Sequence, residues 1–349
     1  MSVSGGRGGL RKCGGPQQVE GPDMEPSRRL VALMAGLCLL GFMAGGGVHA
    51  SLALLTDPEN VSADLATAAS FDSVPPTVST SVVSKTVPYH PGYIRQGGTY
   101  YVYANVTDGG ASPSGVATVT ADVSTITTGQ TAVALVAGAY SIGGVSYNYR
   151  SASVTANASL TEGTYAYTIT ATDVAGNSAT TSGFSVIVDN TRPSGTDVQT
   201  SNAGVTGRPE IGDTITLTFS EVIDPESVLS GWTGSSTNVV LRISNNAGGD
   251  LVTVRDAANT AQLPLGTVNL LGLAYVTTNR DFGATGTPST MVAVGNTIVI
   301  TLGTASGAVG TQAAANNMTW VPTVTLTDRA GNTCQTTTAT EVAPLDLDF

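Results

Sequence analysis

The residues with the clearest capacity for chemistry are the aspartates and asparagines of a seven-residue motif that occurs twice. Thr172–Ser178 reads Thr-Asp-Val-Ala-Gly-Asn-Ser, and Thr327–Thr333, 155 positions later, reads Thr-Asp-Arg-Ala-Gly-Asn-Thr. Carboxylate, amide and turn carbonyl oxygens are the hard ligands that Ca²⁺ prefers. The same residue types also make turns unaided, because Asp bonds the backbone two residues on and Gly and Asn tolerate positive φ. The turn is our preferred interpretation, and calcium is the leading chemical alternative.

Residues for nucleophilic or zinc catalysis are scarce. The two histidines are His49, in an apolar N-terminal run, and His90, between two prolines. A Ser-His-Asp triad, a Cys-His pair and a His-based zinc site each need histidine beside suitable partners. Most aspartates stand in predicted turns, where Asp is expected for backbone reasons. The sequence therefore predicts a protein that is not an enzyme and that requires no cofactor, with Ca²⁺ as the one candidate.

Tyrosine is concentrated in one part of the chain, since ten of the eleven tyrosines fall between Tyr89 and Tyr167. Exposed tyrosines stack on sugars or anchor protein interfaces. The candidates for such an aromatic surface are Tyr89, Tyr93, Tyr101 and Tyr103. Alternating tyrosines in a strand also fill a core or cover one sheet face. The second interpretation is preferred.

Short alternating strands must carry these residues. Apolar side chains recur at every second position in Tyr100–Val106, Tyr165–Ala171 and Ile215–Phe219, with polar residues between them. Short strands with one apolar face and frequent turns predict an all-β fold in which sheets pack face to face. The repeated turn motif, separated by about a domain length, predicts two such β-sandwich domains in tandem.

The closing part of the first domain resembles a known family. Asp173–Asn177, followed by Phe184–Pro193, is similar to the end of a bacterial immunoglobulin-like repeat and its linker. Such repeats build surface stalks and adhesins. Gly212–Glu221 resembles the opening of another bacterial immunoglobulin-like class, found in surface-layer and envelope proteins. The resemblance implies an immunoglobulin-like (Ig-like) fold for both sandwiches.

The resemblance also implies a set of calcium ligands. In calcium-bound arrays of these repeats, acids near the turn and at the linker clamp one domain to the next. Carried to this chain, the candidate ligands are Asp173, Asn177, Asp189 and Asn190, with Asp108 as a neighbour. The second turn, at Asp328 and Asn332, precedes no further domain, so a metal role is less expected there.

The expected organisation follows the chain from end to end. It comprises a disordered N-terminus (1–27), a signal peptide or membrane anchor (28–55), a linker (56–74), Ig-like sandwich one (75–191), Ig-like sandwich two (192–343) with a hairpin insertion at about 245–290, and a tail (344–349).

The N-terminal region has the features of an export segment. Arg28 and Arg29 precede the uncharged run Leu30–Met43, and small residues lead to Ala50. A basic, an apolar and a small-residue region in this order indicate a secretory signal peptide. The run Leu30–Leu55 is also long enough to be a retained membrane anchor. The next stretch, Ser51–Asp72, resembles the leader of TasA- and camelysin-type exported matrix proteins, which implies export by a bacterium.

Composition limits the partners. The formal net charge is −11, and one lysine, Lys85, follows residue 50, so the chain has no electrostatic footprint for nucleic acid. Cys334 is the one cysteine after the export segment, so an internal disulfide is excluded from the mature part. The domains must be stable through their cores.

Together these features predict a non-catalytic, exported cell-surface or extracellular-matrix protein with a structural, spacer role. The alternative is an adhesin-type module that binds glycan or protein through the tyrosines or the 245–290 insertion. Expected partners are other envelope or matrix proteins, glycans, or further copies of the chain. Contact with a membrane is expected only through residues 30–55, if they remain uncleaved.

Overall fold

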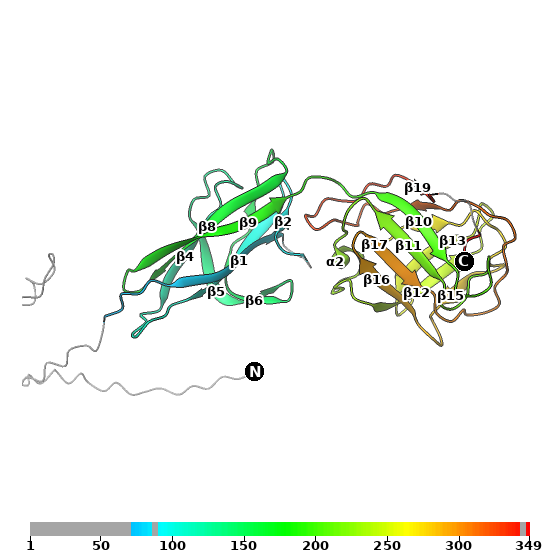
Figure 1. Ribbon diagram of the computed structural model, residues 1–349, viewed down its shortest axis with the longest axis horizontal. Helices are drawn as coiled ribbons and strands as arrows, with labels where there is room; N and C mark the ends of the chain where they lie inside the picture. The colour runs from blue at the N-terminus through cyan, green and yellow to red at the C-terminus, as the bar shows by residue number, and fades with distance from the viewer. Residues whose placement is uncertain (1–70, 86–89, 343–346) are drawn as a thin grey trace, which may run out of the picture. The chain divides into compact units, whose positions relative to one another are not determined.

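The structure, a computed structural model, describes residues 71–85, 90–342 and 347–349. Ala66–Phe349 form one compact unit, and its regular structure is almost entirely β (Figure 1). The predicted all-β fold is therefore confirmed. The expected signal or anchor segment lies outside the described residues. Among the described residues, no helix is long and apolar enough to span a membrane.

The first sheet has nine strands and makes sandwich one. They are β1 (Thr77–Lys85), β2 (Tyr93–Ile94), β3 (Thr99–Thr107), β4 (Val116–Asp122), β5 (Val133–Ile142), β6 (Val145–Ser151), β7 (Val154–Thr155), β8 (Gly163–Asp173) and β9 (Ser178–Val188). Their order is β1-β3-β6-β5-β4-β8-β9-β2, with β7 beside β3. Strand β1 also lies against β9 and β2, so the sheet folds back on itself and encloses a core.

Side-chain alternation explains this core. In β3, Tyr100, Val102, Ala104 and Val106 point inward and are buried, as the period of two requires. The core also contains Val119, Ala121, Ile126, Ile169, Ala171, Val186 and Val188. The turn between β8 and β9 is the first copy of the repeated motif, where Gly176 adopts φ 95°. The predicted turn is therefore present, and it joins two antiparallel strands as a hairpin.

The second sheet has ten strands and makes sandwich two. They are β10 (Gly195–Ser201), β11 (Thr214–Phe219), β12 (Thr237–Ser244), β13 (Leu251–Asp256), β14 (Thr267–Asn269), β15 (Arg280–Phe282), β16 (Ser289–Val294), β17 (Thr297–Thr301), β18 (Thr319–Val321) and β19 (Ala339–Thr340). Their order is β10-β11-β17-β16-β12-β13-β14-β18-β19, with β15 beside β12. Strand β10 also contacts β18 and β19, which closes this sheet around its core.

The core of sandwich two contains both tryptophans of the chain. Trp320 is fully buried, its Nε1 donates to the Leu265 carbonyl at 2.7 Å, and its ring meets Phe219 edge-on at 4.9 Å. Trp232 is also buried and lies just after the single-turn helix α2 (Pro225–Val228), whose N-cap is Asp224. Both tryptophans are therefore core residues of sandwich two.

Two segments differ from simple expectation. The segment at about 245–290, expected as a hairpin insertion, contributes strands β13 to β15 and the start of β16 to the sheet itself. The second turn motif is not flanked by a regular hairpin, and its strands are reduced to an isolated bridge between Thr327 and Thr333. Pro322, which has no N–H to donate to a ladder, directly follows β18, and the backbone then turns over Thr323–Leu326 instead of continuing as a strand.

Replacing Trp320 by alanine should lower the free energy of unfolding of sandwich two by about 3–5 kcal/mol, because it leaves a large cavity and an unpaired Leu265 carbonyl. Trp232 remains as the fluorescence reporter in a urea titration. The exposed Val294→Ala variant is the control and should change stability by less than about 0.5 kcal/mol. Equal losses in both variants would contradict this account of the core.

Candidate metal centres at the ends of the sandwiches

The first turn motif is closed by a buried carboxylate. Asp173 Oδ1 accepts a hydrogen bond from the Asn177 N–H at 2.8 Å, and its Oδ2 accepts one from the Asn177 side-chain amide at 2.7 Å. The Asp173 N–H donates to the Asn177 carbonyl at 3.0 Å. Asp and Asn are therefore needed for the turn itself, as the preferred interpretation holds.

The second motif repeats the same bonds around Asp328. The Asn332 N–H and side-chain amide donate to the two oxygens of the buried Asp328 carboxylate, each at 2.8 Å, and the Asp328 N–H donates to the Asn332 carbonyl at 3.1 Å. Two segments far apart in the chain thus share one local structure, although only the first lies in a regular hairpin.

Each turn is tied to the linker that enters its own sandwich. The Asn177 amide donates to the Asp72 carbonyl at 3.1 Å, and the Asn332 amide donates to the Asp189 carbonyl at 2.8 Å. The calcium set expected from the resemblance is therefore divided. Asp173 and Asn177 precede β9 whereas Asp189 follows it, and eleven extended residues separate them by roughly 35 Å.

These turns and linkers gather two groups of carboxylates. Oxygens of Asp72, Asp108 and Asp173 lie within 4.8 Å of one another, and so do oxygens of Asp189, Glu221 and Asp328. We call these the first and second acidic clusters. Each takes one acid from the entering linker, one from just after a central strand (β3 or β11) and one from the turn motif.

Each cluster contains a buried oxygen that accepts no hydrogen bond. These atoms are Asp108 Oδ1 in the first acidic cluster and Glu221 Oε1 in the second. Burying an oxygen that accepts no hydrogen bond costs free energy. A bound cation or proton would offset that cost in each cluster. The two equivalent atoms single out the clusters from ordinary surface acids.

The clusters differ in their electrostatics. Burial, followed by the neighbouring carboxylates of Asp189 and Asp328, raises the pKa of Glu221 to about 8. Burial also raises the pKa of Asp328. In the first cluster, by contrast, a hydrogen bond from the Ser114 N–H lowers the pKa of Asp72. Proton binding therefore relieves crowding mainly in the second acidic cluster.

Asn190, also expected as a ligand, is occupied by backbone groups. Its Oδ1 accepts from the Gln96 N–H at 2.8 Å, and its Nδ2 donates to the Leu160 carbonyl at 2.8 Å. These bonds hold the end of β9 to two loops of sandwich one. Both polar ends of the Asn190 side chain are thus engaged within sandwich one.

Charged contacts surround the second acidic cluster at the junction of the two sandwiches. Lys85 Nζ lies 2.6 Å from the buried Asp224 carboxylate and donates to the Asp328 carbonyl at 3.1 Å. The Arg329 guanidinium lies 4.1 Å from the centre of the Tyr93 ring and donates to its hydroxyl at 3.0 Å. Lys85, the one lysine after residue 50, thus links sandwich one to sandwich two.

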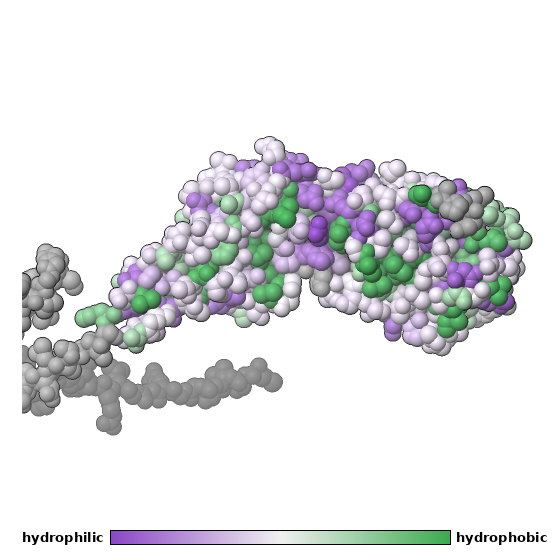
Figure 2. All heavy atoms as spheres, viewed as in Figure 1, coloured by the Kyte–Doolittle hydropathy of each residue, from purple (hydrophilic) through white to green (hydrophobic). Residues whose placement is uncertain are grey.

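The expected aromatic surface is largely engaged within the protein. Tyr103 is only 3% exposed and packs against Tyr101, Tyr140 and Tyr147. The Arg150 guanidinium lies between the Tyr101 and Tyr140 rings, 4.7 and 4.5 Å from their centres. On the face drawn in Figure 2, hydrophobic residues stand in small separate groups. Tyr89 lies outside the described residues.

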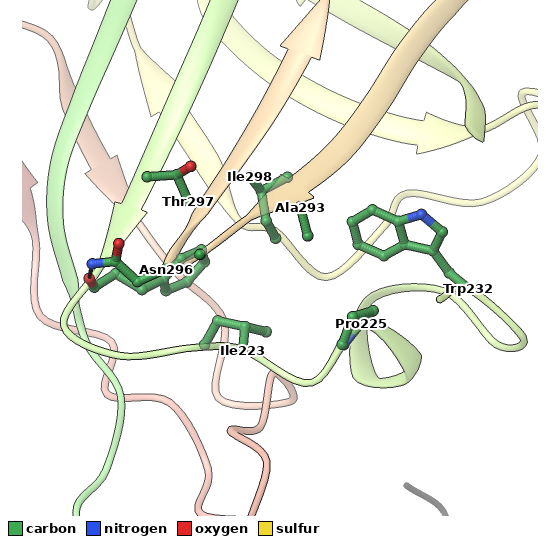
Figure 3. Close-up of a pocket in the computed structure, with 9 residues that line it drawn as sticks. Ile223, Pro225, Trp232, Ala293, Asn296, Thr297 and Ile298 are labelled. Atoms are coloured by element: carbon green, nitrogen blue, oxygen red, sulfur yellow. Dashed lines mark hydrogen bonds between the residues drawn. The ribbon is translucent and has the colours of Figure 1, made fainter. Parts of the chain in front are cut away.

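The pocket in Figure 3 is a small apolar gap between the α2 segment and the β16–β17 hairpin. Ile223, Pro225, Trp232 and Ala293 lie around it, and its volume is about 10 Å³. This is at most the room for one water molecule. It offers no space for a substrate.

Comparison with known families supports this reading of the fold. Residues 106–190 match the model of the bacterial Ig-like domain. The match supports a repeat protein of this type and includes Asp108, Asp173 and Asp189. Ig-like domains of this kind are typical of extracellular or surface proteins and are generally non-catalytic. No curated protein matches the chain.

Sequence reasoning did not select Asp72 or Glu221 and discounted Asp328. The repeat relates the two clusters position by position: Asp72 corresponds to Asp189, Asp108 to Glu221, and Asp173 to Asp328. Alignment of the linkers and central strands, in addition to the turns, would have identified both clusters.

In the absence of divalent metal, stability should fall as the pH rises from about 5 to 8. The raised pKa of Glu221 means that the folded chain keeps a proton in this window that the unfolded chain releases above its usual pKa of 4.5. Melting temperatures in chelator across this range provide the measurement, and Glu221→Gln should flatten the slope.

Asp122→Asn is the matched control, because hydrogen bonding to Ser124 lowers the pKa of Asp122 and places its titration below this window. Its slope between pH 5 and 8 should equal that of the unaltered chain. A slope of the opposite sign in the unaltered chain would contradict the arrangement around Glu221.

Proposed function

We propose that this protein is an exported cell-surface or extracellular-matrix spacer whose Ig-like sandwiches are stiffened by Ca²⁺ at the two acidic clusters. The observation that carries the proposal is the repetition of one carboxylate arrangement at the entry of each sandwich, with a donor-free buried oxygen in both. A single cluster would be ordinary surface acidity. Two equivalent ones suggest a shared purpose.

The donor set favours calcium over other metals. Each cluster offers only carboxylate oxygens, without histidine or cysteine, which suits a hard cation. Oxygens on opposite sides of Ca²⁺ are separated by about 4.6–5.2 Å, twice the usual Ca–O distance. The 4.8 Å limit within each cluster is compatible with that span. The ion would bind the Asp and Glu oxygens and offset their mutual repulsion.

The contacts around the second acidic cluster support a spacer. The chain between β9 and β10 is short, Lys85 and Arg329 bridge from one sandwich to the other, and Asn332 binds the linker between them. A cation shared by Asp189, from the linker, and by Glu221 and Asp328, from sandwich two, would add a bond across the same place. This junction would then keep two sandwiches at a fixed spacing.

The tyrosines favour the spacer over the adhesin. An adhesin would be supported by a contiguous exposed aromatic patch, whereas Tyr103 is buried and Tyr93 is bound by Arg329. The half-buried Tyr101 beside Arg150 is the feature that keeps a glycan- or protein-binding role as the alternative. Partners of the spacer would be envelope or matrix proteins or glycans outside the cell.

Calorimetric titration of residues 66–349 with Ca²⁺ should show two sites. Asp328→Asn should remove one and Asp173→Asn the other, because each change deletes a central carboxylate. Asp256→Asn is the control, since Asp256 bonds to Thr260 on an exposed turn outside both clusters. Unchanged stoichiometry in both cluster variants would refute the proposal.

The junction should also loosen on removal of calcium. Small-angle X-ray scattering should give a larger spread of particle dimensions in chelator than in Ca²⁺, because the crowded carboxylates then repel one another. Glu221→Gln removes one of these charges and one calcium ligand, so its profile should be the same in Ca²⁺ and in chelator. Identical profiles for the unaltered chain in both buffers would show that calcium does not stiffen the junction, and would contradict the spacer mechanism.

A further inference from the structure

The two sandwiches have equivalent ends that differ in their surroundings. We call the end that holds an acidic cluster the entry end, and the end reached by the loop after the first strand the exit end. At the junction, the entry end of sandwich two meets the exit end of sandwich one through Arg329 and Tyr93. The chain therefore pairs an entry end with an exit end once within itself.

The entry end of sandwich one presents apolar residues to solvent. Val174 occupies the same position in its turn as Arg329 does in the second turn, and it is 68% exposed. Phe71, 88% exposed, and Val74 flank the same cluster, beside Asp72. Arg329 of sandwich two packs on Tyr93, whereas the equivalent residue of sandwich one, Val174, is an exposed aliphatic side chain.

The exit end of sandwich two is apolar as well. Residues 202–213 follow β10 and precede β11, as the Tyr93 loop follows β1 and precedes β3. In this loop Ile211 is 55% exposed, and Val205 is also exposed. The Gln312 N–H donates to the Gly207 carbonyl at 2.7 Å, and Gly272, flanked by exposed leucines, also approaches Gln312.

We propose that the entry end of sandwich one binds the exit end of sandwich two of a second copy of this chain. At the internal junction, the Arg329 guanidinium contacts the Tyr93 ring. In the proposed contact between copies, aliphatic side chains face each other instead. Burial of such surface favours association. The contact joins two different surfaces, so it does not close on itself and can extend copies head to tail. The inference rests on the proposed structural role and names its partner.

Sedimentation velocity of residues 66–349 over a concentration series tests this contact. The unaltered unit should form species that grow beyond dimers as concentration rises. Val174→Glu and Ile211→Glu should each weaken self-association at least about tenfold, because each buries a charge in an apolar contact. A 1:1 mixture of the two variants should form dimers only, since each retains one intact end.

Val136→Glu is the matched control, because Val136 is exposed on β5 away from both ends and its variant should assemble normally. Circular dichroism checks that every variant is folded. A unit that remains monomeric at all concentrations, or a variant mixture that stays monomeric, would overturn the inference.

Calcium titration of the same variants separates this result from the spacer mechanism. Ile211→Glu should keep both calcium sites, because Ile211 lies outside both turn motifs and both clusters. Lost assembly with calcium binding intact supports the head-to-tail contact specifically. Assembly that disappears only together with calcium binding would instead assign it to the clusters and overturn the aliphatic contact.

Discussion

The burial of one aspartate in each repeated turn is the constraint on which the rest of the arrangement depends. A carboxylate removed from water must be satisfied, and in both turns the backbone and side chain of the asparagine four residues on provide the donors. The same asparagine amide also reaches the entering linker. The turn thereby fixes the path by which the chain enters each sandwich and brings a linker carboxylate beside the buried one.

The cost of this arrangement appears where the carboxylates converge. Glu221 shares its surroundings with Asp189 and Asp328, and burial, followed by these neighbouring carboxylates, raises its pKa. The basic residues nearby make other bonds: Lys85 pairs with Asp224, and Arg329 stacks on Tyr93. The basic side chains strengthen the junction, and Glu221 Oε1 accepts no hydrogen bond there.

Most of the fold, but only part of the candidate site, could be predicted from the sequence, and individual residues show why. Strict alternation in β3, β8 and β11 defines the buried faces, so these strands and their core residues could be predicted. The irregular path before the second turn could not, because the alternation of Val324 and Leu326 is typical of a strand, whereas the backbone turns over Thr323–Leu326. The sequence analysis grouped the candidate ligands by their proximity along the chain, and the structure places Asp173 and Asp189 in different acidic clusters. Asp173 and Asp189 are close along the chain, but β9 carries them to opposite ends, while Asp328 returns from far downstream to Asp189.

The pairing of β2 with β9 has a mechanical consequence. Tyr93 and Ile94 run parallel to Ile187 and Val188, and Gly92 bonds to both Val83 of β1 and Ile187 of β9. The chain enters sandwich one before β1 and leaves it after β9, at the opposite end. Tension along the chain would pull these strands past each other along their axes and load their hydrogen bonds together in shear. Such a joint resists force better than one whose bonds open singly, so a stretched chain should yield elsewhere before sandwich one unravels.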